Sequence, residues 1–153
     1  MDDWKVVYHE ISSKKAMIYF ILLAFHTMVS PQEIETYELV IKVTNIEVHT
    51  GELKVAVFNN QEDHLKRSIK SGQFKVTHET WLNCTFELPY GEYSFTMYQD
   101  VDLNDELNSN FIGIPNEPYA FSNNASIMFG PPSYDKSKFT FSEDHQIVEV
   151  KLK

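Results

Sequence analysis

Through most of this chain, apolar residues recur at every second position in one short segment after another. Leu39, Ile41 and Val43 alternate with Glu38, Lys42 and Thr44, and a glycine-containing turn at 49–51 separates them from a similar run at 53–57. A period of two places successive side chains on opposite faces of a β-strand, so that one face is buried and the other is solvated. We therefore expect strands here, and the two runs around the glycine turn predict a β-hairpin.

Further segments carry the same alternation, and the first two of them predict a second hairpin joined by a short polar turn. The segments are 73–77, 81–88, 93–98, 139–141 and 147–152. About seven short strands separated by turns are typical of an all-β fold, an antiparallel β-sandwich. We expect one such domain over residues 37–153. The only helical spacing, Leu65 to Ile69 within 62–71, predicts a short crossover.

A long interval, residues 100–138, breaks this regular succession of strands. It is rich in asparagine, proline, glycine and aromatic residues. A connection of this length in a compact domain is usually functional or held down by its own packing. Its aromatic residues predict a packed loop, and this is where we expect functional residues.

Composition restricts the functional classes. With 153 residues the chain fits one domain, and 42% hydrophobic and 14% aromatic residues are typical of a globular protein. The net charge of −9 and the scattered lysines argue against a nucleic-acid partner, which requires clustered basic side chains. The six histidines form no short-spaced ligand pair, and no Gly-x-Ser-x-Gly motif or phosphate-binding loop is present. The sequence therefore predicts no catalytic constellation.

The first residues of the chain predict its cellular compartment. Lys14 and Lys15 precede an apolar run at 16–25, after which the chain turns polar. Basic residues followed by an apolar run of this length and then a polar stretch are typical of a secretory signal peptide. The apolar run is shorter than a helix needs to span a membrane. We expect a leader over 1–30, a short linker over 31–36, and a secreted or periplasmic domain without a membrane span in its mature form. Two alternatives stay open: an N-terminal strand with a buried helix, and an uncleaved membrane anchor.

Cys84 is the only cysteine, so the chain can form no internal disulfide. It shares the apolar phase of its segment with Leu82 and Phe86. This position predicts a buried, unreactive thiol and not a nucleophile.

Oxygen-bearing side chains stand at every second position directly after the segment 93–98, and the residues between them are apolar except Asp105. They are Asp100, Asp102, Asn104, Glu106 and Asn108. Calcium takes about six to eight oxygen ligands, and calcium-binding loops supply them from alternate positions. Phe111 stands where such a loop carries its final bidentate acid, so we expect any bound Ca²⁺ to be structural. The alternative is a solvated acidic turn whose side chains cap their own backbone.

The later part of the long interval is a second candidate site, for a ligand such as a sugar. It combines flat aromatic rings with amide side chains that can form hydrogen bonds. The candidate residues are Tyr119, Phe121, Asn123, Asn124 and Tyr134. The alternative is that the aromatic rings cover one end of the domain while the asparagines satisfy loop backbone.

Several motifs in the second half of the chain follow one another in a specific order. Besides the acidic loop, they are Leu88-Pro89-Tyr90-Gly91-Glu92-Tyr93, Asn110-Phe111-Ile112-Gly113-Ile114-Pro115, Tyr119-Ala120-Phe121-Ser122-Asn123-Asn124-Ala125 and Phe129-Gly130-Pro131-Pro132-Ser133-Tyr134. In this order they resemble the bacterial domain-of-unknown-function family 2141, over about residues 39–152. The resemblance implies a secreted or cell-envelope β-sandwich of the prealbumin-like or immunoglobulin-like kind, and no established activity.

One position of the acidic loop departs from the pattern of that family. The family loop usually reads Asp-x-Asn-x-Asn-Gly-x-x-Asp, and this chain has Asp105 where the glycine usually stands. Glycine readily adopts the positive φ that a tight calcium-type turn needs. We therefore expect a weaker turn at this position.

The leading hypothesis is a secreted or envelope-associated, non-catalytic β-sandwich with a calcium-stabilised loop. It would bind an envelope or extracellular ligand or serve as an accessory module. The alternatives are a carbohydrate-binding module that uses the loop 119–134 and a small hydrolase that uses the acidic loop. In the hydrolase, Asp100 and Asp102 would supply acid-base chemistry. The sequence specifies neither the ligand nor the oligomeric state.

Overall fold

The computed structural model describes residues 33–127 and 130–153. Residues 35–153 form one compact unit. The predicted leader and Phe129 lie outside the described residues. Within the described part of the chain, no helix has the length and apolar character needed to cross a membrane.

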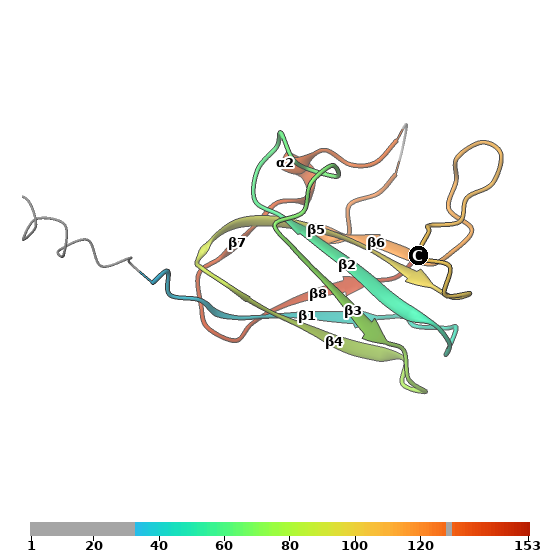
Figure 1. Ribbon diagram of the computed structural model, residues 1–153, viewed down its shortest axis with the longest axis horizontal. Helices are drawn as coiled ribbons and strands as arrows, with labels where there is room; N and C mark the ends of the chain where they lie inside the picture. The colour runs from blue at the N-terminus through green and yellow to red at the C-terminus, as the bar shows by residue number, and fades with distance from the viewer. Residues whose placement is uncertain (1–32, 128–129) are drawn as a thin grey trace, which may run out of the picture. The chain divides into compact units, whose positions relative to one another are not determined.

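The fold is all-β, as the alternating segments predict, and its strands form two sheets (Figure 1). In chain order the elements are β1 (Tyr37–Thr44), β2 (Glu52–Phe58), β3 (Lys70–Lys75), β4 (Trp81–Leu88), β5 (Gly91–Asp100), β6 (Tyr119–Phe121), the 3₁₀-helix η1 (Ser122–Asn124), α2 (Tyr134–Ser137), β7 (Phe139–Phe141) and β8 (Gln146–Lys151). The three-stranded sheet has the order β4-β1-β8. The five-stranded sheet has the order β3-β2-β5-β6, and β7 pairs with the beginning of β5.

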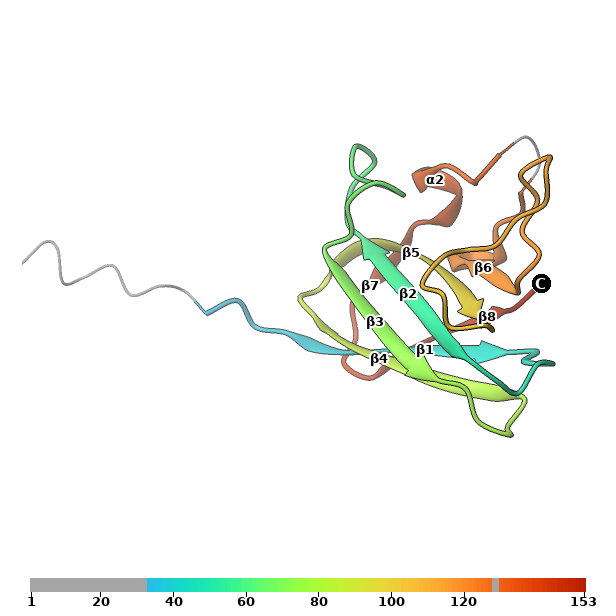
Figure 2. The same cartoon turned by 45° about the vertical axis from the view of Figure 1, so that its right-hand side comes forward.

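Both predicted hairpins are wrong, because β1 and β2 lie in different sheets and so do β3 and β4. The two connections cross from sheet to sheet side by side (Figure 2). The Ile46 N–H donates to the Thr80 carbonyl (3.0 Å) and the Val76 N–H to the Gly51 carbonyl (3.1 Å). A period of two determines which face of a strand is buried, but it does not determine which strand lies beside it.

The pairing of β1 with β8 is parallel, whereas the sequence led us to expect antiparallel strands only. Parallel neighbours need a long crossover connection. Here most of the chain lies between β1 and β8, and an alternating pattern carries no information on strand direction.

The predicted helical crossover over 62–71 is also wrong. Residues 61–66 form turns, and β3 already begins at Lys70. The Asn60 side chain accepts the Asp63 N–H (2.9 Å), and Leu65 has a φ of 61°. An asparagine side chain that bonds the backbone a few residues ahead favours a turn over a helix. Two apolar residues spaced by four were therefore too weak a signal to predict a helix.

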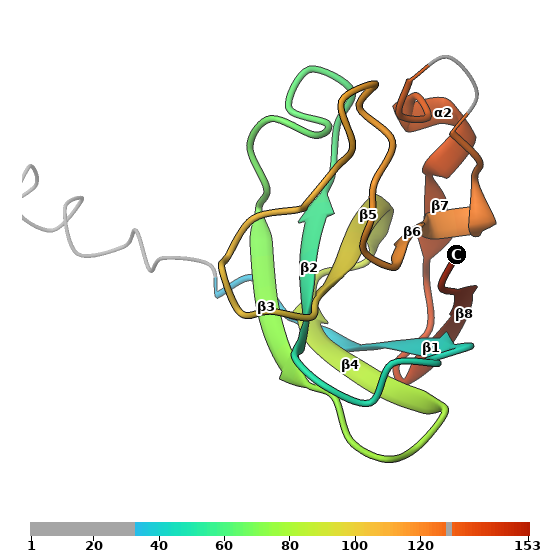
Figure 3. The ribbon, with the colours of Figure 1, turned by 90° about the vertical axis from the view of Figure 1, so that its right-hand side faces the viewer.

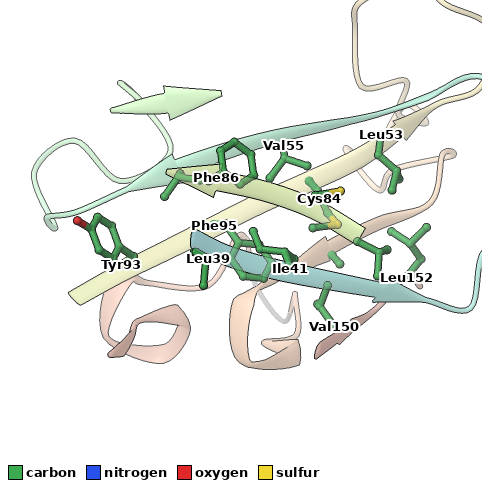
Figure 4. Packing of buried hydrophobic residues seen from close by; sticks show 14 of the residues in the cluster. Leu39, Ile41, Leu53, Val55, Cys84, Phe86, Tyr93, Phe95, Val150 and Leu152 are labelled. Atoms are coloured by element: carbon green, nitrogen blue, oxygen red, sulfur yellow. The ribbon is translucent and has the colours of Figure 1, made fainter. Parts of the chain in front are cut away.

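Buried side chains from both sheets form one hydrophobic cluster (Figure 4). Leu39 and Ile41 come from β1, and Leu53 and Val55 come from β2. Cys84 is buried in the same cluster, as its apolar phase predicts, and burial raises the pKa of its thiol to about 12. A thiol with such a pKa stays protonated and unreactive at neutral pH.

Candidate metal centre

The long interval begins as a loop that leaves the end of β5 and returns to β6, which pairs with β5 (Figure 3). The two ends of this loop lie together. The Gln99 N–H donates to the Pro118 carbonyl (2.7 Å), and the Asn116 N–H donates to the Asn108 carbonyl (2.8 Å). Residues 116–118 are therefore held against the start of the loop, although they follow it by more than a dozen positions in the sequence.

The first half of the loop wraps around the carboxylate of Asp100, which is fully buried (0% exposed). Its Oδ1 accepts the Asn104 N–H (3.1 Å), and its Oδ2 accepts the Asp105 N–H (3.0 Å). Turns of this kind are commonly stabilised by an aspartate whose side chain accepts backbone N–H groups a few residues ahead. Asp100 therefore organises the turn that follows it.

Glu117 holds the other end of the loop, and the sequence prediction missed it. Its side chain is 8% exposed. Oε1 accepts the Val101 N–H (2.9 Å) and Oε2 accepts the Asn108 N–H (3.0 Å), so that one carboxylate clamps both ends of the segment 101–108. One signal could have identified it, because Glu117 is the only acidic residue between positions 107 and 134.

The carboxylates of Asp100, Asp102 and Glu117 converge, each offering one oxygen within 4.8 Å of the others. Two amides complete the group: Asn104 Nδ2 and Asn108 Nδ2 donate to Asp102 Oδ2 at 3.2 and 3.1 Å. The two ends of a side-chain amide are assigned from the bonding network, and turning an amide over presents its oxygen instead of its nitrogen. The three carboxylates offer only oxygen atoms, which suits a hard cation such as Ca²⁺, and each asparagine would add an oxygen only with its amide turned over.

Of the predicted ligands, Glu106 lies outside this group. It is exposed, and its backbone N–H donates to Asn104 Oδ1 (2.8 Å). Glu117 instead of Glu106 supplies the further carboxylate. The third carboxylate of the group thus comes from the bend that precedes β6.

Asp105 occupies the position of the family glycine, and its φ is 63°. The tight turn forms in spite of the missing glycine, because aspartate tolerates the left-handed region better than most residues. Its carboxylate also contacts Lys54 of β2, with Nζ–Oδ1 at 2.7 Å. That hydrogen bond is the main reason that the pKa of Lys54 is raised, while burial opposes the shift and Glu52 supports it. Lys54 Nζ lies 3.8 Å from Asp100 Oδ2, so it also faces the acidic group.

In the second candidate site, Phe121 and Tyr134 are buried, and Phe121 lines a small cavity of about 190 Å³ together with Tyr119. Asn123 Nδ2 donates to the Lys138 carbonyl (2.7 Å), and Asn124 Oδ1 accepts the Lys151 N–H (2.8 Å). These side chains hold the loop and leave Tyr119 as the partly exposed aromatic residue of the set.

Tyr119 instead lines an open cleft of about 750 Å³ beside the acidic group. The cleft shares Asp102 and Glu117 with that group and adds Asn116 and Lys153. Its lining therefore combines one aromatic ring with amide, carboxylate and ammonium groups.

A buried serine–histidine pair was not expected from the sequence. Ser94 Oγ lies 3.0 Å from His64 Nδ1, and His64 Nε2 lies 3.1 Å from the Pro132 carbonyl oxygen. A carbonyl only accepts, so Nε2 carries a proton, and in the neutral ring Nδ1 accepts the serine hydroxyl. Both side chains are buried, and the pair ties the turn 61–66 to the segment before α2.

Comparison with curated proteins finds no significant match, and neither does comparison with solved structures. A family model does match, over residues 41–149, in agreement with the resemblance carried by the motifs. Its description is "Uncharacterized protein conserved in bacteria (DUF2141)", and the chain belongs to this family.

Proposed function

We propose that this protein is a secreted or envelope-associated, non-catalytic β-sandwich whose acidic loop is stabilised by Ca²⁺, with a binding or accessory role. The bacterial family and the signal-like leader support the envelope location. Two sheets that share one core support a sandwich of the prealbumin-like or immunoglobulin-like kind. The observation that carries the calcium proposal is the convergence of Asp100, Asp102 and Glu117 from both ends of one loop.

The physical argument starts from the repulsion among these carboxylates. Like charges this close destabilise one another unless N–H groups or cations face them. Backbone N–H groups face Asp100 and Glu117, and Lys54 Nζ lies 3.8 Å from Asp100 Oδ2. Asp102 is exposed, and among the described residues it receives only the two asparagine amides. A bound Ca²⁺ would be held by the three carboxylates with Asn104 and Asn108, and it would neutralise their charge. Because it would join residues at both ends of the loop, its role is to fix the connection.

Thermal unfolding with and without Ca²⁺ tests the calcium proposal. A ligand of the native state must raise the melting temperature, and the rise grows with concentration. We expect the shift seen in the wild type to disappear in Asp102→Asn, which removes one charge from the cluster. Because Asp102 is exposed, this substitution should leave the fold intact. Glu106→Gln is the matched control, since it removes one exposed carboxylate of the same loop that lies outside the cluster. No shift at millimolar Ca²⁺, or an equal shift in both variants, would contradict the proposal.

A carbohydrate ligand is the second candidate, and the cleft beside Tyr119 is the observation that favours it. An aromatic ring surrounded by amide and carboxylate groups provides both the stacking face and the hydrogen bonds that sugar hydroxyls need. Affinity electrophoresis in soluble neutral polysaccharides tests it. Retardation that is lost in Tyr119→Ala but kept in Tyr90→Ala, an exposed tyrosine elsewhere, would support this function. Unchanged mobility of the wild type would count against it.

The envelope location and the absence of catalysis have separate tests. N-terminal sequencing of exported protein should give a mature chain that begins near residue 31, and retention of the whole chain in the cytoplasm would contradict the location. The hydrolase alternative requires turnover that is lost in Asp102→Asn while the melting temperature is kept. Asp102 is the informative position because the carboxylate of Asp100 is buried and organises the turn.

A further inference from the structure

The tip of the long loop, residues 110–114, exposes large apolar side chains. Phe111 is 98% exposed, Ile112 is 65% exposed and Ile114 is 52% exposed. Figure 1 shows the connection between β5 and β6 projecting beyond the sheets. Single exposed apolar residues are ordinary, but several at one protruding tip mark an interaction site.

The tip is held in this conformation by its own hydrogen bonds. Asn110 Oδ1 accepts the N–H groups of Ile112 (3.1 Å) and Ile114 (3.0 Å). The Asn110 N–H donates to the Ile114 carbonyl (2.8 Å), and the Gly113 N–H donates to the Asn110 carbonyl (2.9 Å). Gly113 has a φ of 80°. The apolar side chains thus stand on a bonded turn that directs them outward.

This bonding satisfies the N–H groups of the tip without water, except that of Phe111, for which the structure shows no partner among the described residues. A backbone N–H carried into an apolar medium without a partner is strongly unfavourable. At the tip, the N–H groups of Asn110, Ile112, Gly113 and Ile114 already have partners within the turn. The tip can therefore leave water without losing hydrogen bonds from these groups.

The distribution of charge points in the same direction. Residues 107–116 contain no charged side chain, although 23% of the chain is charged. The acidic residues Asp102, Asp105 and Glu106 precede this uncharged stretch. An uncharged tip enters a bilayer interface without carrying a charge out of water, and its acidic flanks favour a zwitterionic over an anionic surface because anionic headgroups repel them.

We propose that the tip 110–114 inserts Phe111, Ile112 and Ile114 into the interface of a zwitterionic phospholipid bilayer. One such tip gives a weak and reversible contact, because even a single myristoyl chain binds membranes only marginally. Its effect is to orient the domain on a surface, with the acidic loop at the level of the headgroups. The contact with neutral lipid does not require Ca²⁺.

The test places a polarity-sensitive fluorophore on the full-length chain at Ile112→Cys. The native Cys84 is buried, so it does not compete for the label. The matched control is Ile147→Cys on β8, since Ile147 is 64% exposed and Ile112 is 65% exposed. The predicted leader is common to both labelled proteins, so a difference between them reports the tip alone. With phosphatidylcholine vesicles in EDTA, we expect a blue shift of the label at position 112 and none at position 147.

A second substitution measures the contribution of the aromatic side chain. Phe111→Ser in the labelled Ile112→Cys protein should raise the lipid concentration needed for half the blue shift about tenfold, because a partly inserted phenyl ring is lost. Its melting temperature should not change, because Phe111 is 98% exposed and therefore contributes almost no packing to the fold.

Three results would overturn the proposal: no shift at position 112, equal shifts at both labelled positions, or a shift at 112 that appears without vesicles and grows with protein concentration. The last result would assign the tip to a second copy of the chain. Phosphatidylglycerol vesicles separate this proposal from the calcium proposal. The acidic flanks should weaken binding to them in EDTA, and Ca²⁺ should restore it only if the metal site exists. Failure of that restoration leaves the result with phosphatidylcholine unaffected.

Discussion

The clamp formed by Glu117 makes the sharpest prediction about the stability of the acidic loop. Its carboxylate accepts two backbone N–H groups, from Val101 and Asn108, in a nearly buried position. Hydrogen bonds to a charged group contribute about 1.5–3 kcal/mol each, and a donor left without a partner in a buried site adds its own penalty. Water can reach part of a surface loop after truncation, so we expect Glu117→Ala to lower the free energy of unfolding by about 2–4 kcal/mol.

Urea unfolding in EDTA measures this effect without any contribution from a bound ion. The control is Glu106→Ala in the same loop, where the side chain is exposed and we expect a change within about 0.5 kcal/mol. Glu117→Gln should fall between the two, because the amide keeps one acceptor oxygen and places an NH₂ group against the second N–H. If Glu117→Ala and Glu106→Ala differed by less than about 1 kcal/mol, the clamp would not stabilise the fold as argued.

The turn at Asp105 gives a second prediction: Asp105→Ala should destabilise the fold by about 1 kcal/mol more than Asp105→Gly, because alanine is strained at a φ of 63° and glycine is not. Urea unfolding of both variants checks it, and equal losses would assign the effect to the contact with Lys54 instead. For His145, the hydrogen bond that its Nδ1 donates to the Glu38 carboxylate raises the pKa above its ordinary value of 6.5. The stabilisation is therefore complete below pH 6.5 and is lost as the pH rises through the raised pKa, so the melting temperature should fall over that range in the wild type and not in His145→Gln. Since the ring is mostly exposed, the effect should be small and should shrink in high salt. Cys84 should resist alkylation in the native protein and react fully in denaturant, because burial raises the pKa of its thiol to about 12; rapid reaction in the native state would place it outside the core.

The positions of most strands could be predicted from the sequence, because alternation reports the burial of one strand face directly. Leu39, Ile41 and Val43 are all buried, as their phase requires. The neighbours of each strand could not be predicted in this way. The runs on either side of Gly51 have the alternation of a hairpin, yet each pairs with strands that come later in the chain. Short-range sequence patterns contain no information on contacts between distant segments, and those contacts determine the order of strands in each sheet.

The same distinction between local pattern and distant contact applies to the residues of the candidate site. Asp100, Asp102, Asn104 and Asn108 could be identified because they are close in sequence and their spacing has a chemical meaning. Glu117 could not, because it enters the site only after the loop has folded back on β5. The expectation of a weakened turn at the missing glycine also came from local reasoning, and the structure shows that aspartate takes the glycine conformation with Lys54 beside it.

The folded loop connects its two unusual features, the acidic group and the apolar tip. Glu117 accepts the Asn108 N–H, and the Asn108 carbonyl accepts the Asn116 N–H, so the clamp fixes the base of the hairpin that carries residues 110–114. An apolar tip is useful for contact only if it stays directed away from the core, since a loose tip would fold back to bury its side chains. A carboxylate clamp at the base would oppose that collapse without adding charge to the tip itself. The acidic loop and the uncharged tip are therefore best understood as one device, in which the acidic end provides the rigidity that keeps the apolar end exposed.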